Sequence, residues 1–145
     1  MSSPRRQLLE AVQTCLQAIA IADGFNTDAG ANTSLERIRI PDDGNATLGV
    51  RIAGQAKATE PAVKKTHRLT TFNVVALVPT DGAGAEDKLD QIVADVERAM
   101  ANRQAVYPQG VSFPDYLSMT PATPPEGQKG WIGAVIAYQS HIPIQ

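Results

Sequence analysis

A glycine-rich turn between an apolar run and a helical pattern is the first place where this sequence could support chemistry. The stretch VVALVPTDGAGAEDKLDQIV, residues 74–93, has the strand–glycine–helix order of phosphate-binding loops. Gly82 and Gly84 match the first two glycines of the dinucleotide pattern, but Asp87 stands at the third. Two further carboxylates lie beside it and would repel a phosphate, and Lys88 lacks the spacing of a Walker lysine. The pattern therefore favours a simple turn into a helix.

The remaining reactive residue types do not form a catalytic pattern. Cys15 is the only cysteine and falls on the apolar stripe of an expected helix, where it is predicted to pack. His67 and His141 have no acidic residue at metal-ligand spacing, and no serine sits in a G-x-S-x-G elbow. We therefore expect no enzyme activity, no catalytic residue, no cofactor-binding residue and no metal site.

Charge is distributed unevenly along the chain. The segment 51–68 has a net charge of +4 and the segment 81–97 a net charge of −5, against −2 for the whole protein. The basic segment holds no aromatic residue to stack a base, so direct nucleic-acid recognition is not expected. Opposed charged patches on a small protein suit head-to-tail association with copies of itself or with partners.

The hydrophobic pattern predicts the elements that position these residues. Helices are expected over 3–24 and 85–102, because apolar residues recur there at spacings of three and four. Strands are expected over 35–40, 46–54, 68–78, 115–120 and 130–142, with the first two forming a hairpin. The order predicts one α+β domain, residues 1–145. Its fold is a two-layer sandwich, with a mixed, mostly antiparallel sheet of four to five strands and two main helices on one face. No apolar run is long enough to span a membrane.

Two connecting segments carry further expectations. The stretch 54–67 is predicted to be a flexible loop, long for a connection between adjacent strands and able to become ordered by contact with a neighbour. The proline-rich segment 108–127 holds Phe113, Tyr116, Leu117 and Met119 and is expected to pack against the body. Seven residues are candidate partner-interface residues: Lys57, Lys64, Lys65 and Arg68 on one surface, and Asp81, Glu86 and Asp87 on a second.

The layout of the whole chain resembles the tail terminator (tail completion) proteins of long-tailed bacteriophages, the lambda minor tail protein U-like group. The matching features are an amphipathic helix ending in AIAIADGFNTDAG, strands holding LERIRI and LGVRIAG, and a polar loop before HRLTTFNVVALVP. An acidic turn into DKLDQIVADVERAM and a last strand, GWIGAVIAYQSHI, complete the match. The likeness is one of pattern, and no single residue string carries it.

The resemblance implies a non-enzymatic virion protein. In that family a hexameric ring caps the tail tube, stops its polymerisation and then receives the head-side joining protein. The implied partners are further copies of this chain, the tail tube protein and the head–tail joining protein. The implied location is the head-proximal end of the virion tail, after assembly in the host cytoplasm. Two other classes stay open: another virion part, such as a head–tail connector or tube component, and a small ligand-binding or regulatory domain unrelated to phage.

Overall fold

The computed structural model describes residues 3–35, 46–80, 84–123 and 130–144. Its two α-helices are α1 (Pro4–Gln17) and α2 (Ala85–Met100). The strands are β1 (Thr33–Ser34), β2 (Thr47–Lys57), β3 (His67–Pro79), β4 (Asp115–Ala122) and β5 (Trp131–Pro143). Short 3-10 turns occur at Ile21–Asp23, Ala29–Asn32 and Pro61–Val63.

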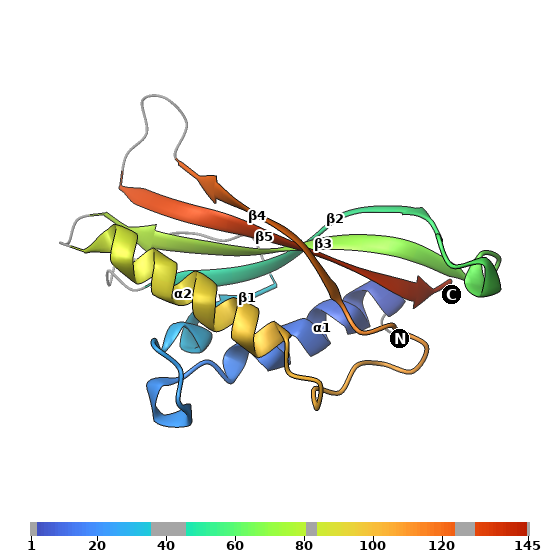
Figure 1. The fold of residues 1–145 in the computed structure, drawn as a ribbon, viewed down its shortest axis with the longest axis horizontal. Helices are drawn as coiled ribbons and strands as arrows, with labels where there is room; N and C mark the ends of the chain where they lie inside the picture. The colour runs from blue at the N-terminus through green and yellow to red at the C-terminus, as the bar shows by residue number, and fades with distance from the viewer. Residues whose placement is uncertain (1–2, 36–45, 81–83, 124–129, 145) are drawn as a thin grey trace.

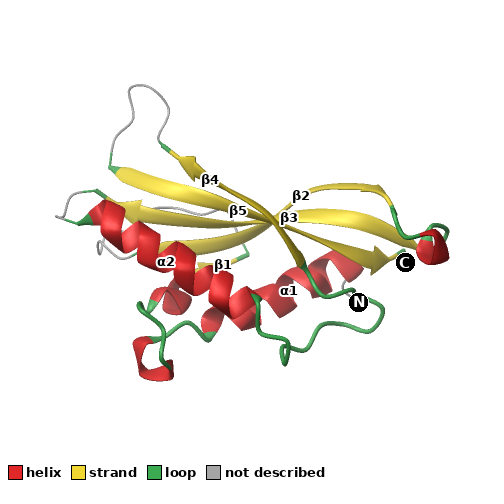
Figure 2. Ribbon diagram, viewed as in Figure 1, coloured by secondary structure: helices red, strands yellow, loops and turns green. Residues whose placement is uncertain are grey.

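The strands form one five-stranded sheet in the order β1-β2-β3-β5-β4. The β2/β3, β3/β5 and β5/β4 pairs are antiparallel, and the β1/β2 pair is parallel. Both α-helices lie on the same side of the sheet (Figure 1). The expected α+β arrangement, with a mixed, mostly antiparallel sheet and two helices on one face, is therefore confirmed, and Figure 2 shows its two layers.

The expected first hairpin is not tested by the described residues. Most of its first strand, 36–40, lies outside the described residues. The nearby β1 pairs with Leu48 and Gly49 in the parallel sense, so Thr33 and Ser34 form a short parallel edge strand. The four strands that follow agree with the periodicity, including the short strand expected around 115–120.

Helix α1 begins as its sequence predicts and ends earlier. The Ser3 hydroxyl accepts a hydrogen bond from the Arg6 amide at 3.2 Å, and Pro4 occupies the first turn. The helix ends at Gln17, and Gly24 (φ 91°) instead closes the following 3-10 turn. The backbone of Gly30 packs closely on the end of α1, where an added Cβ would clash with the Leu16 carbonyl oxygen.

The core lies between the sheet and the helices. Alternate residues of β3 and β5 are buried there with the apolar stripes of α1 and α2, as expected for a sheet covered on one face. The central contributors are Leu8, Val12, Leu16, Phe72, Val74, Ile92, Val96, Ile136 and Tyr138.

A buried carboxylate joins α2 to the segment that follows α1. Asp95 is 1% exposed and accepts hydrogen bonds from the Asn26 amide (3.0 Å), the Thr27 amide (2.8 Å) and the Thr27 hydroxyl (2.7 Å). We call the segment 26–30, held between the end of α1 and Asp95, the helix joint. Asp95 can be buried because two backbone amides and a hydroxyl replace water around its carboxylate.

Candidate interaction surfaces

Four predicted interface residues come together at one corner of the molecule. Lys57, at the end of β2, pairs in register with Arg68 near the start of β3. Lys64 and Lys65 follow the 3-10 turn between these strands. All four side chains are exposed and line one hollow with Gln55 and Ala56. We call Lys57, Lys64, Lys65 and Arg68 the basic corner.

The connection that carries the basic corner is shorter than the expected loop of 54–67. Residues 54–57 belong to β2, because their backbone pairs with 68–71 of β3. The remaining nine residues are held by hydrogen bonds from the Thr66 amide to the Val63 carbonyl (3.1 Å) and from the Ile144 amide to the Thr66 carbonyl (2.9 Å). Ala58 is 2% exposed and anchors the start of the turn. These contacts hold the lysines in place without using their charges.

Both histidines make hydrogen bonds that connect this corner to neighbouring segments. The Thr59 amide donates to His141 Nε2 at 3.2 Å, so that nitrogen carries no proton. His67 Nε2 lies 3.0 Å from the Gly110 carbonyl oxygen, and its Nδ1 lies 2.8 Å from the Thr66 hydroxyl. Since a carbonyl only accepts, Nε2 is the protonated nitrogen of His67. The histidines thus fasten the corner to β5 and to the segment before β4.

One residue of α1 contacts the strand beside the basic corner. Arg5 Nη1 donates to the Gln55 side-chain oxygen at 3.2 Å, which brings a further cation to the edge of β2. Arg6 instead pairs with Glu10 of its own helix at 3.5 Å. The two arginines at the start of α1 therefore have different surroundings.

The predicted acidic surface lies at the opposite end of the sheet. Glu86 and Asp87 are exposed in the first turn of α2, where carboxylates complement the helix dipole, and Asp81 lies outside the described residues. The basic corner sits at the start of β3, and α2 begins just beyond its end (Figure 1). Thirteen residues of strand put about 40 Å between the two ends. The structure thus separates the two predicted groups within one molecule.

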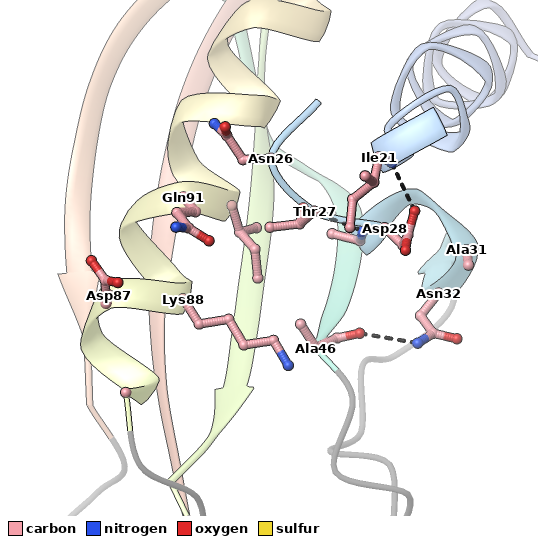
Figure 3. Close-up of a pocket in the computed structure, with 13 residues that line it drawn as sticks. Ile21, Asn26, Thr27, Asp28, Ala31, Asn32, Ala46, Asp87, Lys88 and Gln91 are labelled. Atoms are coloured by element: carbon pink, nitrogen blue, oxygen red, sulfur yellow. Dashed lines mark hydrogen bonds between the residues drawn. The ribbon is translucent and has the colours of Figure 1, made fainter. Parts of the chain in front are cut away.

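A hollow of about 630 Å³ lies between the first turns of α2, the helix joint and Ala46 (Figure 3). Lys88 extends from α2 toward this hollow. The Asp28 carboxylate accepts a hydrogen bond from the Ile21 amide at 2.8 Å, and the Asn32 side chain donates one to the Ala46 carbonyl at 3.1 Å. Its described lining contains no serine, cysteine or histidine. The hollow thus offers polar contacts, and the one hydroxyl of its described lining, on Thr27, donates to the buried Asp95 carboxylate as part of the fold.

Strand β4 differs most from its expected environment. Phe113 is half-buried, in edge contact with the Tyr107 ring and beneath the Arg103 guanidinium, as expected of a packed segment. Tyr116, Leu117 and Met119 are instead 49%, 44% and 41% exposed. They were predicted to pack, but β4 is an edge strand, and the described structure places nothing beyond it.

Beside β4 is a second hollow, of about 270 Å³, against the last turns of α2. Glu97, Asp115, Tyr116 and Tyr138 contribute carboxylates and aromatic rings, and Arg103 also reaches it. Burial and the nearby Glu97 carboxylate raise the pKa of Tyr138 above its usual value. Desolvation and the same carboxylate also raise the pKa of Tyr116. Sequence reasoning missed this hollow because its residues come from three separate elements.

Cys15 occupies the packed position that was expected. It is half-buried on α1, and its sulfur lies 3.6 Å from the Tyr107 hydroxyl. Burial, together with this contact, raises the pKa of Tyr107. Nothing in these contacts marks the thiol as a nucleophile, because no described base lies against it.

No helix within the described ranges is long and apolar enough to cross a membrane. The same residues contain no group of three or more His, Cys, Asp or Glu side chains placed to hold a metal ion.

Comparison with known proteins gives a likeness in fold. Neither a protein-family model nor a curated protein sequence matches the chain. The structure is similar to a chain of the solved "Virion of native gene transfer agent (GTA) particle", with a TM-score of 0.60 and 19% sequence identity. The match covers 94% of this chain and 95% of the other. The α+β arrangement described above is therefore shared with a virion chain over nearly its whole length.

Proposed function

We propose that this protein is a structural component of a phage or phage-like virion. We further propose that it forms a ring on the end of the tail tube, stops tube polymerisation and offers its other face for head joining. The observation that carries this proposal is the fold likeness to a gene transfer agent virion chain, end to end in both chains. In this role the single domain 1–145 acts by occupying a surface, with no bond made or broken.

The surfaces of the molecule support a role in assembly. The basic corner presents four cations on a turn whose backbone is already held in place, so little backbone ordering is needed when a partner binds. The carboxylates of the α2 first turn lie at the far end of the sheet. Charges separated in this way allow two different contacts on one molecule, which a ring between tube and head requires.

The test is to mix the purified protein with polymerising tail tube subunits and measure tube length by electron microscopy. We expect short tubes, each closed at one end by a single ring, and no long tubes from the protein alone. Unlimited tube growth in its presence would contradict the terminator role. Incorporation along the tube would indicate a tube component instead, and binding only to the head vertex would indicate a connector.

A further inference from the structure

The edge strand β4 exposes an apolar surface that a lone soluble protein would be expected to cover. Seven of its eight residues are exposed, including Tyr116, Leu117 and Met119. Edge strands favour association, and natural proteins block their backbone with charge, proline or bulges, or cover them. Asp115 is the only charged residue on this strand. The exposed side chains therefore indicate a contact surface.

The hollow beside this strand suits a cationic side chain. The carboxylates of Glu97 and Asp115 and the rings of Tyr116 and Tyr138 all line it, with the two rings 5.7 Å apart in an edge-to-face arrangement. Carboxylates with aromatic rings are the surroundings that attract lysine and arginine. Arg103, the only cation among the described lining residues, has its guanidinium over the Phe113 ring at 4.3 Å.

Simple strand addition along the β4 edge is restricted. Pro121 has no amide hydrogen to donate, and the register with β5 shifts between Tyr116 and Ser118, so Leu117 is an extra residue on this strand. Both features interrupt a regular ladder with an incoming strand. Side chains, and charge above all, must therefore supply most of the recognition on this edge.

The complementary charge lies on the other edge of the same sheet. Among the described residues, β1 pairs with Leu48 and Gly49 alone, so β2 is the outermost described strand at the basic corner. β4 is the outermost strand on the opposite side. Two complementary surfaces on opposite edges of one molecule make a head-to-tail contact, and such contacts close into rings when the rotation permits.

We propose that Glu97, Asp115, Tyr116, Leu117 and Met119, here called the acidic–aromatic edge, receive the basic corner of a second copy of this chain. A lysine of the corner enters the hollow, and the exposed apolar side chains of β4 close around it. This inference rests on the proposed function in that it takes the two copies to be neighbours in one ring. In this contact the acidic side is the acidic–aromatic edge, and not the first turn of α2.

Paired charge reversals test the contact. The variants are Glu97→Lys/Asp115→Lys, Lys64→Glu/Lys65→Glu and the two combined, and ring mass is measured by analytical ultracentrifugation alone and with tube subunits. Each reversal should weaken ring formation at least about tenfold, because like charges then face one another across the contact. The combined variant should recover most of the wild-type ring.

Controls separate the contact from folding and from net charge. Asp23→Lys/Asp90→Lys makes the same charge change at two exposed positions outside the hollow and should leave rings intact. Glu97→Gln/Asp115→Asn removes charge without reversing it, and should weaken rings with an unchanged melting temperature even if the lysine variant folds poorly. The proposal would be overturned if rings were unaffected by either reversal, if the combined variant showed no recovery, or if the control variant lost rings to the same extent. A wild-type protein that never forms rings would also overturn it.

Tube length in the same samples tests the proposed function separately. If rings form and respond to the reversals as expected while tubes grow without limit, the contact stands and the terminator role fails. If tubes are capped equally well by wild type and by all reversal variants, the terminator role stands and the contact fails.

Discussion

The helix joint and the basic corner are both built around charge, and they use it in opposite ways. In the joint, one buried carboxylate is surrounded by three donors within hydrogen-bond distance. In the corner, four exposed cations share one hollow while the backbone contacts beneath them hold the turn. The charge at the helix joint stabilises the fold, whereas the charges of the basic corner remain available to a partner. Substitutions in the two regions should therefore have opposite consequences for folding and assembly.

Removal of the joint carboxylate should have the largest effect on stability. Asp95→Ala leaves two amides and a hydroxyl without their acceptor, and we expect a loss of about 2–4 kcal/mol in the free energy of unfolding. Urea denaturation checks this. Asp90→Ala, an exposed position on the same helix, is the matched control and should change stability by less than about 0.5 kcal/mol. Similar losses in both variants would contradict the role given to Asp95.

A pair of glycines compares the packing of the two regions. Gly30→Ala in the joint brings a Cβ within 2.4–2.9 Å of three carbonyl oxygens at the end of α1, and should cost about 1–3 kcal/mol. Gly54→Ala, in β2 close to the corner, meets nothing within 4 Å and should be tolerated. Melting temperatures measured side by side give the comparison. A Gly30→Ala protein as stable as wild type would show that the backbone at the end of α1 shifts to make room for the added Cβ.

Charge reversal in the corner should change assembly with little effect on folding. Lys64→Glu/Lys65→Glu removes repulsion among neighbouring cations and should shift the free energy of unfolding by less than about 0.5 kcal/mol. Copy–copy association should weaken, and wild-type association should itself fall as salt is raised. Ring mass at two salt concentrations measures this. A wild-type ring that is insensitive to salt would argue against electrostatic contact at the corner.

The smallest expected effect is a pH dependence in the interior. The pKa of the Tyr138 hydroxyl is raised by burial and Glu97, so the folded state favours the neutral phenol. Stability from this group is complete below pH of about 10, the usual tyrosine pKa, and falls as pH rises above it. Denaturation at pH 8 and 11 should therefore show a shallower fall for Tyr138→Phe than for wild type. Equal falls would assign the alkaline sensitivity to other groups.

Much of the fold could be predicted because its periodicities are strong. The apolar stripe of α2 and the alternation in β3 and β5 set their type and buried face directly. Gly30 shows what local patterns miss: the end of α1 lies against the backbone of a residue thirteen positions further along the chain. The same limit explains why the burial of Asp95 could not be predicted, since its partners lie 68 and 69 positions away.

The candidate surfaces were predictable to different degrees. The basic corner was recoverable because its four residues are close in sequence and flank one turn. The acidic–aromatic edge was not, because Glu97 and Asp115 belong to different elements and only the sheet order makes β4 an edge. An exposed tyrosine, leucine and methionine on a short strand look in sequence like buried residues.

The sheet order also determines when the protein can finish folding during synthesis. β5 follows both of its neighbours in the chain and yet lies between them. Until Trp131–Pro143 has left the ribosome, β4 has no strand to pair with, and one side of β3 stays open. Helices α1 and α2 and the β2–β3 hairpin are free to form earlier, from contacts closer in the chain. Until β5 emerges, the nascent chain therefore exposes the unpaired β4 and one open side of β3, and β5 is the strand that closes the sheet.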